Sequence, residues 1–279
     1  MISPTLISGG IALLLILLWL IYRYSLFISA PNGLPILLYH KVSLDRNDAL
    51  TISVDRLDRQ LAYIDSSGYT PISFAELKAS FDGLRTLPAK PVIVTFDDGY
   101  VSTYELAYPL LVKHDVKATI FLPTAFIGGN AGWSGASEPL ISYEMIGQLA
   151  ANRPAGNQHA GKLIEFALHG HRHESYERYT PAQIESDLSQ CLHALEASGC
   201  AFGRVFAYPY GRMPRDPSTD SAMREFFRRN RIDFAARIGS RINALPPADV
   251  YELKRTAVRG TDSFWEFKTK LRKGRVKLF

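Results

Sequence analysis

The chain has 279 residues, of which 47% are hydrophobic and 21% charged, a composition typical of a globular protein rather than a disordered or fibrous one. The formal net charge of +5 comes from 32 basic and 27 acidic residues, and no basic run carries interleaved aromatics, so we expect no nucleic-acid partner. Two cysteines, Cys191 and Cys200, fit neither a disulfide framework nor a zinc motif, and we expect Cys191 to be a buried free thiol.

An apolar run dominates the N-terminus. Leu6–Ile21 is almost entirely apolar, and Arg23 follows it between two tyrosines. A membrane-spanning helix needs about 17–25 apolar residues, so this run is just long enough. A cleavable signal peptide, the alternative, would need a basic start that this chain lacks. We therefore expect residues 1–30 to be an uncleaved transmembrane anchor and residues 31–279 to form a separate domain.

Apolar segments that predict buried strands then alternate with segments that predict helices. The strands are expected at Pro35–Tyr39, Pro91–Phe96, Ala118–Leu122, Leu163–Leu168, Arg204–Ala207, Ile232–Ala236 and Leu253–Val258. One helix is expected to begin at the capping box of Thr180 and to end at Gly199. This alternation predicts parallel βα units, and about seven such strands in one domain predict a barrel. In barrels of this kind the chemistry lies at the C-terminal ends of the strands.

Two adjacent carboxylates, Asp97 and Asp98, follow the second of these strands and precede Gly99. Neighbouring strand residues point to opposite faces, so a turn, which Gly99 permits, is needed to bring both carboxylates to one site. Two like charges held close together are costly unless a cation or a shared proton offsets them. The pair therefore indicates a metal or proton-transfer site, and an acidic turn exposed to water is the alternative.

Three histidines, His169, His171 and His173, follow the strand that ends at Leu168. On a strand all three would share one face, whereas on a helical turn the outer two would pair and His171 would point away. Two histidines and one aspartate with an open fourth position make a good catalytic zinc site. A solvated polar loop is the alternative.

A third motif, Phe206–Gly211, has the sequence Phe-Ala-Tyr-Pro-Tyr-Gly and follows the next strand. It reads either as a rigid turn or as a backbone N–H presented to a developing oxyanion between aromatic walls suited to a sugar. His40 also follows a strand directly. The barrel would therefore bring His40 to the same end as the three motifs.

In this order, Thr95–Tyr100, His169–His173 and Phe206–Gly211 resemble the signature motifs of the polysaccharide deacetylase (NodB-homology) family. The resemblance runs from about Pro35 to the C-terminus. It implies a distorted (β/α) barrel that removes N- or O-linked acetyl groups from glycans with a divalent metal. Zinc is the expected ion, with cobalt, nickel and iron as alternatives.

The resemblance also implies roles for individual residues. Asp97 corresponds to the general base, and Asp98, His169 and His173 correspond to the metal ligands. This correspondence favours the pairing of the two outer histidines. The backbone N–H of Tyr210 would help to form the oxyanion hole.

Two departures from the family pattern affect these roles. Many members carry an arginine where this chain has Ala207, so a partner for Asp97 must come from elsewhere, and we consider Arg255. Many members also carry a late Leu-x-His-Asp motif with the general acid, and none follows Gly211. His40 resembles the rearranged equivalent in the subgroup that includes poly-N-acetylglucosamine deacetylases, and a core histidine at a strand end is the alternative.

The chain as a whole predicts a membrane-anchored hydrolase of carbon–nitrogen bonds other than peptide bonds, which removes N-acetyl groups from a glycan containing N-acetylhexosamine. The alternatives are a hydrolase of O-acetyl esters or non-glycan amides on the same metal site, and a catalytically silent glycan-binding module. Arg23, Lys41 and Arg46 follow the apolar run, and the positive-inside rule would then put the catalytic domain in the cytoplasm. The resemblance favours the periplasmic or outer face of the membrane, which is the side we expect.

Overall fold

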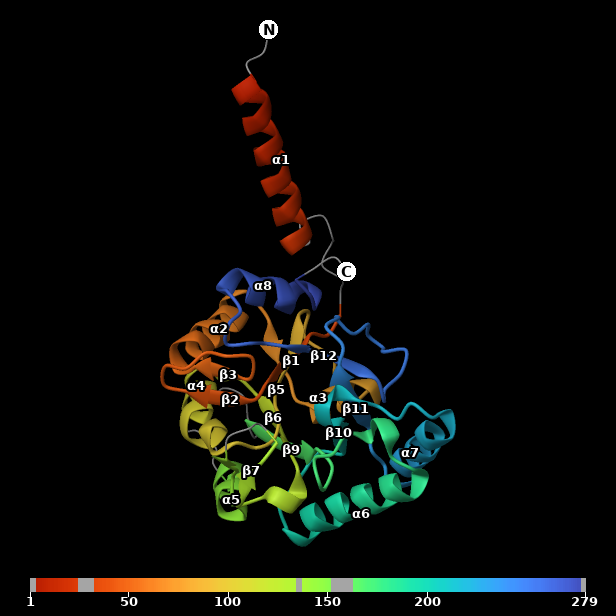
Figure 1. Ribbon diagram of the computed structural model, residues 1–279. Helices are drawn as coiled ribbons and strands as arrows, with labels where there is room; N and C mark the ends of the chain where they lie inside the picture. The colour runs from red at the N-terminus through yellow and green to blue at the C-terminus, as the bar shows by residue number, and fades with distance from the viewer. Residues whose placement is uncertain (1–3, 25–32, 134–136, 152–162, 277–279) are drawn as a thin grey trace.

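The computed structural model describes residues 4–24, 33–133, 137–151 and 163–276 (Figure 1). Within these residues, seven strands form a closed barrel in which every pairing is parallel. They are β1 (Ile36–Tyr39), β5 (Pro91–Phe96), β6 (Ala118–Leu122), β9 (Ile164–Leu168), β10 (Val205–Ala207), β11 (Phe234–Ile238) and β12 (Leu253–Ala257). Their order around the barrel is β1-β12-β11-β10-β9-β6-β5, and β5 pairs with β1 to close it. The predicted (β/α) barrel is thereby confirmed.

Helices surround the barrel on its outer face (Figure 1). They are α2 (Val54–Ser66), α4 (Tyr108–Lys113), α5 (Tyr143–Ala151), α6 (Pro181–Ala197), α7 (Pro217–Arg229) and α8 (Phe264–Lys273). The predicted capping box begins α6, because the Thr180 side chain accepts from the N–H of Gln183 and Gln183 accepts from the N–H of Thr180. The apolar face of α6 contains Cys191, which is a buried free thiol as predicted.

A further helix, α3 (Phe74–Phe81), covers the end of the barrel where the strands begin. The ring of Phe74 lies 6.0 Å from that of Phe234, the first residue of β11. Glu165 of β9 accepts hydrogen bonds from the N–H groups of Phe74 and Ala75 at the start of this helix, both at 3.2 Å. The open end of the barrel is therefore the one at which the strands finish.

Short strands outside the ring complete the fold. β4 (Thr70–Pro71) pairs with β5, β2 (Lys41–Ser43) pairs in parallel with β3 (Thr51–Ser53), and β7 (Asn130–Ala131) pairs antiparallel with β8 (Glu138–Pro139). None of these short strands was predicted from the sequence.

The interior of the barrel is filled by one apolar side chain or more from each strand. These include Ile36, Ile93, Phe121, Ala167, Val205, Phe234 and Leu253. Strand residues two positions apart share a face, so the residues an even number of positions after these apolar side chains also face the interior of the barrel. Asp97, His169 and Arg255 occupy such positions on, or directly after, β5, β9 and β12.

The N-terminal helix α1 (Pro4–Tyr24) forms as predicted, but the prediction that it spans a membrane is wrong. Among the residues that the structure describes, no helix has the length and apolar character needed for a membrane crossing. The predicted single-pass membrane localisation, and the predicted membrane contact through this helix, are corrected accordingly. The predicted boundary between residues 30 and 31 lies outside the described residues.

Candidate functional site

Asp97 is held inside the barrel by Arg255 of β12. Nη2 of Arg255 donates to Oδ2 of Asp97 at 2.8 Å, and Nη1 donates to the other carboxylate oxygen. Arg255 is fully buried and Asp97 is 3% exposed. Burial raises the pKa of Asp97, but the guanidinium charge of Arg255 opposes this effect and the pKa is lowered from its ordinary value. Asp97 is therefore an ionised carboxylate at neutral pH, and Arg255 is the partner that the sequence suggested.

Asp98 reaches the same site because the chain turns sharply after β5. Asp98 has a φ of 71° and Gly99 a φ of 67°, so two successive residues adopt the left-handed region. Glycine adopts this region without steric cost, and a Cβ at Gly99 would also lie 2.7 Å from Cδ2 of Leu122. Both carboxylates are buried, and the alternative of an acidic turn exposed to water is wrong.

The segment His169–His173 is neither a strand nor a helical turn. Its outer histidines converge on Asp98, since Nε2 of His173 lies 3.0 Å and Nε2 of His169 lies 3.4 Å from Oδ1 of Asp98. His171 points away, with Nδ1 2.9 Å from the Thr124 hydroxyl. His173 has a φ of 54°, and this left-handed conformation brings its ring back to the site. Both outer histidines are buried, and a solvated loop is excluded.

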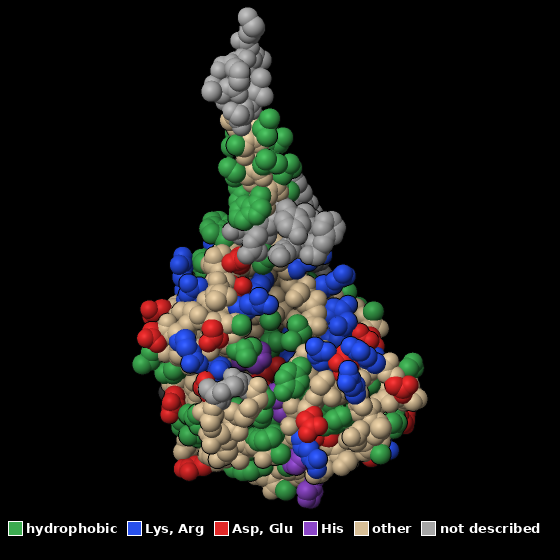
Figure 2. All heavy atoms as spheres, viewed as in Figure 1, with side chains coloured by type: hydrophobic (Ala, Val, Ile, Leu, Met, Phe, Trp, Pro, Cys, Tyr) green, Lys and Arg blue, Asp and Glu red, His purple; other side chains and the backbone are tan. Residues whose placement is uncertain are grey.

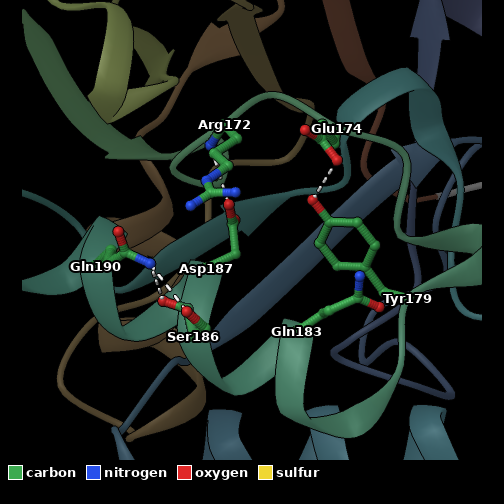
Figure 3. Close-up of a pocket in the computed structure, with 7 residues that line it drawn as sticks. All are labelled: Arg172, Glu174, Tyr179, Gln183, Ser186, Asp187 and Gln190. Atoms are coloured by element: carbon green, nitrogen blue, oxygen red, sulfur yellow. Dashed lines mark hydrogen bonds between the residues drawn. The ribbon is translucent and has the colours of Figure 1, made fainter.

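Asp187 of α6 holds the segment His169–His173 in place, and this role was not predicted from the sequence. Its carboxylate accepts from the N–H of His171 at 2.8 Å, from the N–H of Arg172 at 3.0 Å and from the Tyr176 hydroxyl. Figure 3 shows Asp187 beside Arg172. A Cβ at Gly170 would lie 2.9 Å from the same carboxylate. The available signal was a carboxylate on the otherwise apolar face of α6, where an unpaired charge is not tolerated.

Asp98, His169 and His173 have the arrangement of a metal site. One ligand atom from each of them lies within 4.8 Å of the others. Nδ1 of His169 donates to the carbonyl oxygen of Ala207 at 2.8 Å, which leaves Nε2 as a free lone pair directed at the site. Oδ1 of Asp98 is buried and has no hydrogen-bond partner among the described residues. One carboxylate oxygen and two imidazole nitrogens suit zinc, so the residues present fit a divalent ion.

A cavity of about 460 Å³ opens over these groups. His40, Trp133 and Tyr210 line it together with the carboxylates and the outer histidines. Tyr210 has a φ of 56° and is 49% exposed, and its ring lies 4.9 Å from that of His173. Burial lowers the pKa of His40, although the nearby carboxylates of Asp98 and Asp97 oppose this. Figure 2 shows a hollow on this face of the molecule with histidine and acidic side chains in its floor.

The structure thus brings every predicted site residue into one cavity. They are His40, Asp97, Asp98, His169, His173 and Tyr210. The cavity lies at the carboxyl ends of the barrel strands, as the fold prediction required. Trp133 also lines the cavity, and its place beside the metal ligands was not predicted from the sequence.

Comparison with known proteins gives a consistent result. The family model for polysaccharide deacetylase matches residues 85–225. The Bacillus subtilis protein YxkH, provisionally named a polysaccharide deacetylase, is 27% identical over 182 residues, which are 65% of this chain and 58% of that protein. The poly-beta-1,6-N-acetyl-D-glucosamine N-deacetylase of Escherichia coli K12 is 36% identical over 94 residues, which are 32% of this chain and 14% of that enzyme. The chain therefore matches less than two thirds of the length of these relatives.

Solved structures show the same fold. IcaB from Ammonifex degensii is 24% identical with a TM-score of 0.67, and the match covers 87% of this chain and 97% of IcaB. The Streptococcus pyogenes deacetylase PplD, solved in complex with acetate, is 20% identical with a TM-score of 0.67, over 87% of this chain and 99% of PplD. At these identities the likeness is one of fold.

Proposed function

The chain belongs to the polysaccharide deacetylase family, and from this premise we propose that it is a metal-dependent hydrolase that removes N-acetyl groups from a glycan containing N-acetylhexosamine. The observation that carries the proposal is an ionised carboxylate, Asp97, buried beside three convergent metal-ligand atoms at the floor of one cavity. Relatives named as poly-beta-1,6-N-acetyl-D-glucosamine N-deacetylases support an amide substrate and an N-acetylglucosamine polymer. We assign this activity to residues 31–279.

The metal site would consist of Asp98, His169 and His173. Zinc is the first choice, and cobalt, nickel and iron accept the same donors. A bound divalent ion would supply Lewis acidity toward the acetamide carbonyl and toward water. The buried Oδ1 of Asp98 and the free Nε2 of His169 support this assignment, because both are directed at the site without another partner that would occupy them.

Asp97 would act as the general base, taking a proton from water as that water attacks the acetamide carbonyl. Arg255 supports this role in two ways. It keeps the carboxylate ionised at neutral pH, and its two parallel hydrogen bonds hold the carboxylate plane in a single orientation. A preorganised base of this kind needs no rearrangement when the substrate arrives.

The remaining roles would fall to Tyr210 and His40. Tyr210 stands in a left-handed turn directly after β10, an unusual conformation for a residue with a side chain, and its backbone N–H would donate to the developing oxyanion. His40 lines the cavity near both carboxylates and would protonate the leaving amine.

The test is acetate release from β-1,6-linked N-acetylglucosamine oligomers and from chitooligosaccharides, with the full chain stripped of metal and then reloaded with zinc, cobalt or nickel. Metal-dependent acetate with one new free amine for each acetate is the expected result. Acetate with a new hydroxyl in place of the amine would assign the site to esters. Tight metal binding with no acetate would point to another amide, and absence of metal binding would favour a silent glycan-binding module.

The base is tested separately by Asp97→Asn. This variant should lose turnover yet still bind zinc, since Asp97 is not one of the three convergent ligands. Asp82→Asn is the matched control, because Asp82 is an exposed carboxylate paired with Lys78 on α3. Acetate release by Asp97→Asn at the rate of the control would remove Asp97 from the mechanism.

A further inference from the structure

Trp133 contacts two of the three proposed metal ligands at once. Its indole Nε1 donates a hydrogen bond to Oδ2 of Asp98 at 3.3 Å. Its ring also lies against the imidazole of His173, with 4.1 Å between the ring centroids and 31° between the ring planes. Trp133 is half-buried and lines the same cavity, so it stands beside the ligands without being one.

The hydrogen bond gives the two oxygens of Asp98 different surroundings. Oδ1 faces Nε2 of His173 at 3.0 Å and Nε2 of His169 at 3.4 Å, whereas Oδ2 faces the indole of Trp133. A donor on Oδ2 fixes the rotation of the carboxylate about its Cβ–Cγ bond. The oxygen left for a metal ion is then Oδ1, the one with no hydrogen-bond partner among the described residues.

The two histidines are oriented by different means. His169 is fixed by the hydrogen bond from Nδ1 to the carbonyl oxygen of Ala207, which is the usual way in which a ligating imidazole is held. Nδ1 of His173 is buried and has no such partner within the described part of the chain. Its ring instead contacts the rings of Trp133, at 4.1 Å between centroids, and Tyr210, at 4.9 Å. Ring contact therefore substitutes for the missing hydrogen bond.

Trp133 is itself held by a small apolar cluster separate from the main core. The ring of Phe126 meets the indole edge-on, with 4.9 Å between centroids and 75° between planes. Tyr100, Ala131 and Leu140 complete the cluster, and the pairing of β7 with β8 brackets the segment that carries Trp133. The indole is thus supported from behind and directed at the ligands in front.

We propose that Trp133 is a positioning residue of the metal site, which orients Asp98 through its N–H and His173 through its ring. The inference rests on the proposed metal-dependent function and deepens it. Because Trp133 acts on two ligands, its loss weakens metal binding in a graded way: one part of the effect belongs to the N–H and another to the ring. Arg255 and Asp97 are held by other contacts, so the general base is not disturbed.

Three variants of the full chain separate these effects. Trp133→Phe keeps a ring against His173 but removes the donor to Asp98, and Trp133→Leu removes both. Trp265→Phe is the matched control, since Trp265 is 68% exposed on α8. The zinc dissociation constant is measured by competition with a chromophoric chelator, and the visible spectrum of the cobalt-loaded protein reports the ligand geometry. Thermal unfolding of the metal-free proteins is measured alongside.

Trp133→Phe should bind zinc about 10-fold more weakly than the parent and Trp133→Leu up to about 100-fold, the range seen when residues behind metal ligands are replaced. The cobalt spectrum should change in Trp133→Phe because the Asp98 carboxylate is free to rotate. Trp265→Phe should match the parent in every measurement. An unchanged zinc affinity and cobalt spectrum in Trp133→Phe would overturn the inference even if activity fell.

The outcomes keep the inference and the proposed function apart. A parent protein that binds neither zinc nor cobalt overturns the metal-dependent function, and the inference with it. A parent that binds zinc while both Trp133 variants bind it equally well overturns only the inference. If Trp133→Leu unfolds, the more conservative Trp133→Phe, which keeps an aromatic ring, still decides the question.

Discussion

Arg255→Met is expected to destabilise the metal-free protein by about 3–5 kcal/mol at pH 7. Arg255 is fully buried and donates two hydrogen bonds to Asp97, which is itself 3% exposed. Methionine has a similar reach but no charge, so the substitution leaves an ionised carboxylate in the barrel without its cation. The guanidinium also lies 5.1 Å from the ring of Phe121, and this contact is lost with it. Domains are typically stable by about 5–15 kcal/mol, so the loss is a large part of the total.

The origin of this cost is tested by a double-mutant cycle. Asp97→Asn in the Arg255→Met background removes the uncompensated charge, and the double variant should recover much of the lost stability. A matched control is Arg228→Met on α7, whose partner Glu225 is 3.0 Å away but exposed. Removing an exposed pair of this kind should cost about 1 kcal/mol or less.

The assay is urea unfolding of the metal-free proteins followed by far-ultraviolet circular dichroism at pH 7, with the slope of the transition checked for two-state behaviour. Two results would refute the reasoning. One is a loss in Arg255→Met no larger than that in Arg228→Met. The other is a double variant as unstable as the sum of its single variants, which would mean that the two buried charges do not stabilise each other.

Three further predictions concern residues that support the site or the barrel. Asp187→Asn should lower the free energy of unfolding in urea by about 1–3 kcal/mol, because one amide oxygen replaces two acceptor oxygens. Zinc binding should weaken as well, and unchanged values of both would show that this carboxylate does not support the site. Burial raises the pKa of Glu165, so the folded protein binds this proton more tightly than the unfolded chain and the free energy of unfolding falls as pH rises above about 4. The stability of Glu165→Gln should therefore improve relative to the parent as pH rises through this range, and urea midpoints that run parallel with pH would contradict this. Gly260→Ala should lower the free energy of unfolding by about 1–3 kcal/mol, because the new Cβ would lie 1.9 Å from the carbonyl oxygen of Thr51. An unchanged melting temperature would show that the backbone moves to accommodate the Cβ without cost.

Much of the barrel was predictable because its strands are short, buried and almost wholly apolar. The strand predicted at Pro91–Phe96 and that at Ala118–Leu122 have the same bounds in the structure, and the other five differ by one or two residues at their ends. The short pairs β2–β3 and β7–β8 were missed because strands of two or three residues leave no periodic pattern. The transmembrane prediction failed because it rested on hydropathy at the margin of the length required.

The site was predictable where its residues are neighbours in the chain and unpredictable where they are not. Asp97 and Asp98 are adjacent, and the outer histidines are four residues apart, so each pair can be recognised as a short sequence motif. Trp133 and Asp187 act from loops and helices distant in sequence, and only folding reveals their contacts. Arg255 was considered only because Ala207 stands where many family members carry an arginine, and its pairing with Asp97 across the barrel is seen only in the folded chain.

The pairing of Arg255 with Asp97 links the last strand of the barrel to an early one across 158 positions of the chain. While the chain is being synthesised, Asp97 is present long before Arg255, whose charge lowers the pKa of Asp97. In a partly folded protein whose barrel is still open, Asp97 would therefore be an ordinary solvated carboxylate. Its pKa would be lowered by Arg255, and its orientation fixed, only when β12 docks between β1 and β11. Hydrolytic activity would thus depend on closure of the barrel. A circular permutant would keep this activity only if its new termini leave β12 free to dock.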